Sequence, residues 1–104
     1  MKIYVVTTQS QYDYDFSVAT LKHGAFFYYE NALRQLLQQI KKFKTAHKDD
    51  KKEYTNKELY REEGDGAWTE FSDLEHGYWC VSFGFEEHHE CHQICIDEFE
   101  LDVK

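Results

Sequence analysis

Apolar and polar residues follow two different periods along this chain, and the first segment has the pattern of a β-strand. Lys2–Thr8 is rich in β-branched and aromatic residues and is apolar on both faces, which is typical of a central strand. The polar stretch 9–13 predicts a turn, and the apolar residues of 16–21 predict a second strand. Because the connection is short, we expect an antiparallel hairpin, ended by Lys22-His23-Gly24.

Further along, apolar residues recur every three or four positions, which is the period of an amphipathic helix. Glu30 lies near the start of this segment and three lysines lie near its end, as the helix dipole prefers. The polar segment 45–54 predicts a solvated extension of the helix or a loop. The apolar stripe consists of Leu33, Leu36, Leu37, Ile40 and Phe43.

Two shorter segments also have helical signals. Thr55 and Glu58 have the spacing of a capping box, which predicts a short helix that ends near Glu63. In Ala67–His76 the large apolar residues are three positions apart, a spacing that favours a helical turn over a strand. These residues are Trp68, Phe71 and Leu74.

The last quarter of the chain predicts a second hairpin. Its strands are Tyr78–Phe85 and Gln93–Leu101, and residues 86–92 form the connection. The elements then follow the order β-β-α-(α)-β-β. This order predicts an α+β fold over a single domain, residues 1–104, in which one long helix packs on an antiparallel sheet of about four strands.

Charge is divided unequally between the two parts of the chain. The net charge is -8, yet the chain up to Tyr60 holds ten basic and seven acidic residues, and the rest holds two basic and thirteen acidic ones. Between Glu62 and Val103 there is no Lys or Arg, so no sequence neighbour neutralises these carboxylates. We expect a negative surface that attracts a basic protein and repels nucleic acid and anionic membranes. The alternative is that these charges serve solubility alone.

Neither a membrane span nor a signal peptide is predicted. No apolar run approaches the roughly 20 residues that a spanning helix needs, and the mean hydropathy is -0.77. The apolar start, Met1–Thr7, is too short for a signal peptide. Three cysteines in such a chain predict cytosolic thiols or metal ligands, and hence a cytoplasmic protein.

Potential metal ligands are densest in the second hairpin. Three imidazoles and two thiols lie within 88–95, and the hairpin brings a third thiol opposite Cys95. Zinc prefers four such nitrogen or sulfur donors. The spacing matches neither a C-x₂-C pair nor the H-E-x-x-H helix, and a polar hairpin tip with two semi-buried thiols is the alternative. The candidate ligands are Cys80, His89, Cys91 and Cys95.

Aromatic residues form two further clusters. Tyrosines and carboxylates alternate at Tyr12, Asp13, Tyr14 and Asp15, a composition that suits a protein interface, although the tyrosines of an ordinary hairpin also fold over the sheet edge. The run 26–29 leads into the helix and must supply part of the core. The two tryptophans, Trp68 and Trp79, are core candidates.

No pattern in the chain predicts catalysis or a cofactor. There is no G-x-S-x-G elbow and no Gly-rich phosphate loop. Paired acids such as Glu62 and Glu63 are sequence neighbours and do not face each other. The lysines of 41–57 have few aromatic residues among them, and the acidic half opposes nucleic acid, so direct nucleic-acid binding is not expected.

The two ends of the chain resemble small uncharacterised proteins of phages and mobile elements. The resemblance rests on Lys2–Thr8, on 12–15 and on the acidic segment Ile96–Asp102. Together with the acidic half it implies a non-enzymatic module that inhibits a host nucleic-acid-binding defence protein, as anti-CRISPR proteins do, by docking carboxylates on its basic cleft. A metal-binding or redox-responsive protein is the alternative. The expected partner-binding residues are Glu86, Glu87, Glu90, Asp97, Glu98, Glu100, Tyr12, Asp13, Tyr14 and Asp15.

Crowded carboxylates also lead to an expectation about pH. Imidazoles among carboxylates hold their protons more tightly than free histidine, and the carboxylates themselves titrate at raised pKa. The sequence therefore predicts a domain that is more stable near pH 6 than near pH 8. The histidines concerned are His88, His89 and His92.

Overall fold

The computed structural model describes residues 1–12, 18–55, 67–85 and 88–102. The described strands are β1 (Lys2–Tyr12), β2 (Val18–Phe26), β3 (Ala67–Asp73), β4 (Tyr78–Phe85) and β5 (His88–Glu100). The helices are α1 (Tyr29–Ala46), α2 (Lys48–Tyr54) and the short 3-10 helix η1 (Leu74–His76). All five strands pair antiparallel in the order β2-β1-β5-β4-β3. The α+β class is confirmed, with five strands in the sheet.

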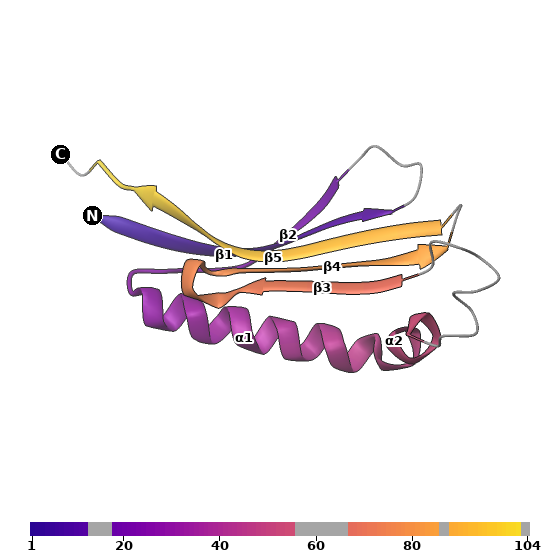
Figure 1. Cartoon of the computed structure of the whole chain (residues 1–104). Coiled ribbons are helices and arrows are strands. Elements are labelled where there is room, and N and C mark those ends of the chain that lie inside the picture. Colours follow the sequence, from indigo (N-terminus) through magenta and orange to yellow (C-terminus); the bar gives the residue numbers. More distant parts are fainter. Residues whose placement is uncertain (13–17, 56–66, 86–87, 103–104) are drawn as a thin grey trace.

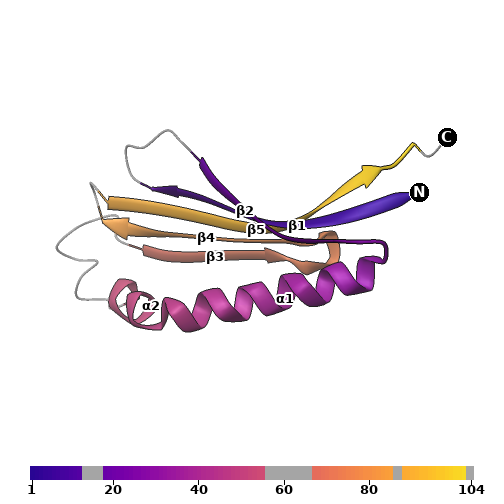
Figure 2. The same ribbon diagram turned by 180° about the vertical axis from the view of Figure 1, so that it is seen from behind.

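Both α-helices lie on the same face of the sheet, so the molecule has two layers, and β1 and β5 extend beyond the start of α1 (Figures 1 and 2). No helix among the described residues covers the opposite face of the sheet. The N-terminus, the start of α1 and the β3–β4 turn lie at one end of the molecule, and α2 lies at the other (Figure 1). We call the side that the helices cover the helix face and the other side the open face.

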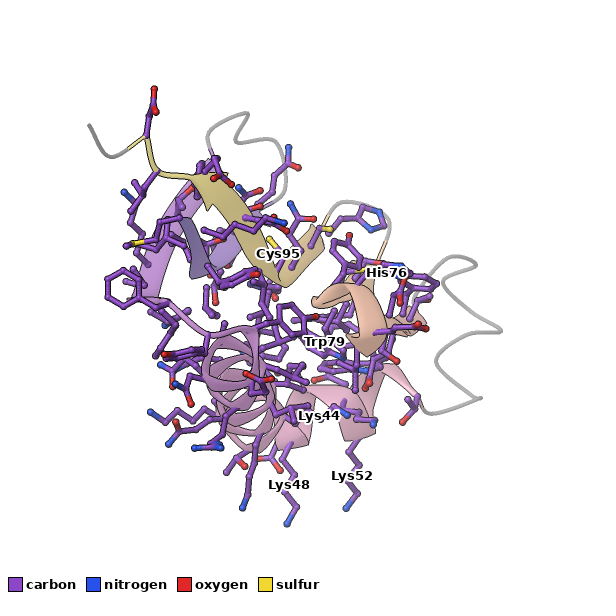
Figure 3. All side chains as sticks on the ribbon, turned by 90° about the vertical axis from the view of Figure 1, so that its left-hand side faces the viewer. Lys44, Lys48, Lys52, His76, Trp79 and Cys95 are labelled. Atoms are coloured by element: carbon purple, nitrogen blue, oxygen red, sulfur yellow. The ribbon has the colours of Figure 1, made fainter. Side chains whose placement is uncertain are left out.

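The core forms where the apolar stripe of α1 meets alternate residues of the central strands. Leu36 is fully buried and Ile40 is 8% exposed, whereas Leu37, at the border of the stripe, is 45% exposed. Trp79 is 2% exposed and lies between the sheet and the helices (Figure 3), so its expected place in the core is confirmed. The buried apolar residues are Val6, Ala32, Leu36, Ile40, Trp79, Val81, Phe83 and Ile94.

The expectation of a helical turn at Ala67–His76 is wrong for most of its length, because Ala67–Asp73 is strand β3. Its seven residues pair with β4. This pairing gives hydrogen-bond partners to backbone N–H and C=O groups that would have none in a single helical turn. The spacing of three places Trp68 and Phe71 on opposite faces. Trp68 stacks on Phe83 on the helix face, and Phe71 contacts Tyr78 on the open face.

Three expected turns are shorter than the sequence predicts. The polar residues that follow Thr8 continue β1 to Tyr12, because β1 pairs with β5 over its whole length. The Lys22-His23-Gly24 segment does not end β2; a register shift, together with Gly24 at φ +138°, lets the strand continue. Similarly, β5 begins at His88 rather than at Gln93.

The expected capping box also differs at its first residue. Thr55 follows the last turn of α2, and its hydroxyl donates to the carbonyl of Lys51 at 2.7 Å. It therefore lies at the C-terminus of a helix and does not cap the start of one. The remainder of that expected helix lies outside the described residues.

Candidate functional site

The expected carboxylates of β5 do not share one face of the sheet. Side chains alternate along a strand, so Asp97 lies on the open face with Thr7 and Cys95, and Glu98 and Glu100 lie on the opposite side. Glu90 belongs to the helix face, in register with Tyr12. Glu86 and Glu87 lie outside the described residues.

Strand β1 supplies cations that the local sequence lacks. Because β1 pairs with β5, Lys2 Nζ lies 2.9 Å from a carboxylate oxygen of Glu98, and the Met1 amino group lies 3.1 Å from one of Glu100. The hydrogen bond and the charge of Glu98 raise the pKa of Lys2. No sequence neighbour neutralises these two carboxylates, as expected, but residues from the other end of the chain do.

A third carboxylate is neutralised by the helix layer. Glu70 of β3 accepts a hydrogen bond from the Trp68 indole at 2.7 Å and lies 3.3 Å and 3.1 Å from the ammonium groups of Lys44 and Lys51. Burial alone would raise the pKa of Glu70, but the indole and the two ammonium groups together lower it. This side chain joins β3 to α1 and α2 and is not available to a partner.

Five carboxylates gather at the end of the sheet that holds the chain termini. The Ile96 N–H donates to the Gly77 carbonyl at 2.8 Å, which sets the β3–β4 turn beside the last residues of β5. We call this group the acidic end; the Lys2 and Met1 cations are beside it. It consists of Asp73, Glu75, Asp97, Glu98 and Glu100.

The charges of the acidic end affect titratable groups beside it. Tyr29 lies at the start of α1 and donates its hydroxyl to the Glu75 carbonyl at 3.1 Å. Burial raises the pKa of Tyr29, and the charges of Asp73 and Glu75 raise it further. His76 lies 2.9 Å from Asp73 and adds a positive charge only when it is protonated. Asp73 and Glu75 were not expected from the sequence, because nothing local shows that their turn meets β5.

Lysines occupy the other end of the helix layer. In Figure 3, Lys48 and Lys52 project from the helices away from the sheet, whereas Lys44 is directed towards β3, where it pairs with Glu70. The molecule measures 60 Å along its longest axis. At this end the lysines are interspersed with the acids of α2, Asp49, Asp50 and Glu53, so its charges are mixed, whereas carboxylates predominate at the end that holds the termini. The lysines are Lys41, Lys42, Lys44, Lys48, Lys51 and Lys52.

The candidate metal ligands share the open face. Cys80 pairs with Gln93, and Tyr78 pairs with Cys95. The expectation that Cys80 lies opposite Cys95 is therefore wrong by two residues along the strand. In Figure 3, Cys95 lies on the side of the sheet away from the helices. Within the described part of the chain, no three His, Cys, Asp or Glu residues are grouped so that they could hold a metal ion. The metal-binding alternative stays a prediction.

Burial raises the pKa of the Cys91 and Cys95 thiols. Tyr78, hydrogen-bonded to Cys80 and partly buried, has its pKa raised to about 12. These thiols are therefore poor nucleophiles at neutral pH, because the thiolate is the reactive form.

His92 occupies an environment that the sequence did not indicate. It lies on the helix face and is 2% exposed. Its Nδ1 lies 2.7 Å from the Ser10 hydroxyl, and its Nε2 has no hydrogen-bond partner among the described residues. Burial, and then the neighbouring His47, lower its pKa to about 4. The expectation that His92 holds its proton tightly is therefore wrong, because its neighbours are rings and not carboxylates.

Of the expected tyrosine and carboxylate cluster, the structure describes only Tyr12. Its ring is 47% exposed and meets the His92 ring edge-on at 5.4 Å. Asp13, Tyr14 and Asp15 lie outside the described residues.

No family model matches this chain, and no curated protein or solved structure matches it at a significant level. No helix among the described residues is long and apolar enough to cross a membrane.

Proposed function

We propose that this chain is a non-enzymatic, cytoplasmic protein-binding module whose acidic end docks on a basic surface of a partner protein. The observation that carries the proposal is the gathering of five carboxylates at one end of the sheet, with Lys2 and the Met1 amino group as the cations paired to two of them. Asp73, Glu75 and Asp97 carry charge that no Lys or Arg pairs with among the described residues.

Electrostatic attraction at such a surface acts mainly on the rate of encounter. Charge complementarity raises association rates and rejects partners of the wrong sign. In the docking that we propose, the carboxylates of β5 and of the β3–β4 turn occupy the sites that phosphate groups fill when the partner binds nucleic acid. The partner class that we propose is therefore a nucleic-acid-binding protein, and the resemblance of the chain ends to phage proteins favours a host defence nuclease that the module inhibits.

The test compares three versions of the protein as capture baits in bacterial lysate. The first is the wild type, and the second removes charge at the acidic end (Glu75→Gln, Asp97→Asn, Glu100→Gln). The third is a matched control that removes the same number of charges from α2, at the far end of the molecule (Asp49→Asn, Asp50→Asn, Glu53→Gln). Each substitution replaces a carboxylate by an amide of the same shape.

We expect the wild type and the helix control to capture the same nucleic-acid-binding protein, and the second version to lose it. Duplex DNA should displace the captured protein, because both occupy the same basic surface. Capture that is equal for all three versions, or that DNA leaves unchanged, would contradict the proposal.

The redox-responsive alternative is favoured by one observation, the placement of three thiols on the open face. It predicts that mild oxidation changes thiol content and melting temperature together. Zinc content of the purified protein, with the thermal shift on adding zinc, tests its metal-binding form. Less than about a tenth of an equivalent of zinc and no shift would dispose of that form.

A further inference from the structure

Exposed apolar and aromatic side chains gather at the same end of the molecule as the acidic end. Ten large apolar side chains are exposed among the described residues, and six of them belong to elements that meet at this end (Figure 1). Single exposed apolar residues are ordinary on a protein surface, whereas a group of them marks a contact surface. The six are Met1, Phe27, Tyr28, Leu74, Phe99 and Leu101.

Three of these side chains surround a hollow. The hollow has a volume of about 380 Å³, lies between the start of β1 and the β2–α1 connection, and is lined by Met1, Lys2, Phe27 and Tyr28. The two aromatic side chains are 62% and 68% exposed. Pockets that take small molecules begin at about 300 Å³, so the hollow has room for one large side chain of a partner.

Contacts between β1 and β5 hold one wall of the hollow in place. The Leu101 N–H donates to the Met1 carbonyl at 2.6 Å, and the Met1 amino group lies 3.1 Å from Glu100 Oε1. Lys2 Nζ lies 2.9 Å from Glu98 Oε1, so the cation of this wall is already engaged. A wall that is fixed before binding loses little conformational freedom when a partner arrives.

The surroundings of the hollow are negative although two cations belong to its wall. Glu98 and Glu100 engage Oε1 with these cations, and Oε2 of each has no hydrogen-bond or ion-pair partner within the described ranges. Glu30 follows in the first turn of α1, and Glu75 is held beside Tyr29. Neither of these two pairs with a Lys or Arg of the described residues. A cationic side chain is therefore attracted to the hollow.

We propose that the hollow takes an arginine side chain of the partner, an inference that rests on the proposed function. A guanidinium group is planar, stacks on aromatic rings and donates to carboxylate oxygens in pairs. In the proposed contact it stacks on Phe27 or Tyr28 and donates to the Oε2 atoms of Glu98 and Glu100. A lysine ammonium is a compact charge that does not stack. Surfaces that contact phosphates carry arginine, so the proposed partner class supplies this residue.

The test is an NMR titration at low ionic strength with two blocked tripeptides of equal charge, glycine-arginine-glycine and glycine-lysine-glycine. We expect the arginine peptide to shift the amide signals of Lys2, Phe27 and Tyr28, and to bind at least about threefold more tightly than the lysine peptide. The double variant Phe27→Leu and Tyr28→Leu keeps apolar side chains but removes both rings, so it should lose this preference.

The matched control removes two exposed rings from the open face, Phe71→Leu and Phe99→Leu, which are 57% and 52% exposed in the wild type. It should keep the preference for arginine. Equal affinity of the wild type for the two peptides, or a preference that persists in the Phe27→Leu and Tyr28→Leu variant, would overturn the proposal.

The peptides bind without the partner, so this result is separate from the test of the proposed function. An arginine preference in a protein that captures no nucleic-acid-binding partner would support the hollow and contradict only the proposed function. Capture that depends on the acidic end, in a protein without the arginine preference, would support the proposed function and overturn only the hollow.

Discussion

At the scale of single residues, the His92 imidazole controls how stability depends on pH. It is enclosed by the rings of Tyr12, Phe43 and Phe83 and by the second imidazole, His47, which pairs with Asp50. A charged imidazole is disfavoured there, and the pKa of His92 falls to about 4. A histidine in the unfolded chain titrates near about 6.5. The unfolded state therefore takes up the proton first.

We predict that the contribution of His92 to the free energy of unfolding is complete above about pH 6.5 and is lost as the pH falls towards 4, by about 3 kcal/mol in all. The measurement is urea unfolding at several pH values, for the wild type and for His92→Phe, which keeps an aromatic ring in the site. Both proteins share their carboxylates, so the difference between their pH profiles isolates His92. Identical slopes below about pH 6.5 would show that this imidazole titrates normally.

Gly77 is the second residue whose local geometry makes a prediction. Its φ is +67°, and a Cβ there would lie 3.0 Å from the Cβ of Ile96. We expect Gly77→Ala to lower the free energy of unfolding by about 2 kcal/mol, measured by urea denaturation. In the background of Ile96→Ala the same substitution should cost less, because the contact is then relieved. An equal cost in both backgrounds would leave only the backbone conformation as the cause.

At the scale of elements, α2 is held to the sheet by few contacts, since none of its residues is buried. Lys51 pairs with Glu70 and lies 5.9 Å from the centre of the Trp68 ring, whereas Lys52, its sequence neighbour, projects away from the sheet (Figure 3). We predict that Lys51→Ala lowers the free energy of unfolding at low salt by about 1 kcal/mol, which a lower melting temperature would report. Lys52→Ala should have almost no effect on either quantity. Equal effects would mean that α2 is held by its backbone and not by this contact.

The sequence predicted the type of an element correctly wherever its apolar residues kept one period over several turns. The stripe of α1 repeats over several turns, so the helix and its buried face could be predicted. Strand β3 is short, and its Trp68 and Phe71 suit a helix and a strand equally well until β4 is in place. The long β1 and β5 were also underestimated, because the residues that extend them are polar on both faces, such as Gln9 on the open face and Ser10 and His92 on the helix face. Pairing between distant strands determined these lengths, and no local pattern reports it.

The same limit applied to the candidate site. The sequence shows directly that the last part of the chain is acidic. It does not show which of these carboxylates lack a cationic partner in the folded protein. Lys2 is nearly a hundred residues from Glu98 in sequence and 2.9 Å from it in space. Glu70 is neutralised from the helices in the same way. The acidic end was therefore found only after the order β2-β1-β5-β4-β3 was known.

At the scale of the whole molecule, the gathering of carboxylates at one end of its 60 Å length is the property on which the proposed function rests. A partner with a basic surface is attracted to that end, whereas the lysines at the other end are offset by Asp49, Asp50 and Glu53, so the charge also orients the encounter.

The most direct test of the proposed function is the rate at which the protein associates with the captured partner, measured by stopped flow as ionic strength rises. We predict that the rate for the wild type falls at least about tenfold between low and high salt. The version with Glu75→Gln, Asp97→Asn and Glu100→Gln should be slower at low salt and depend less on salt, and the helix control should match the wild type. A rate that is independent of salt, or the same salt dependence in all three versions, would contradict docking through the acidic end.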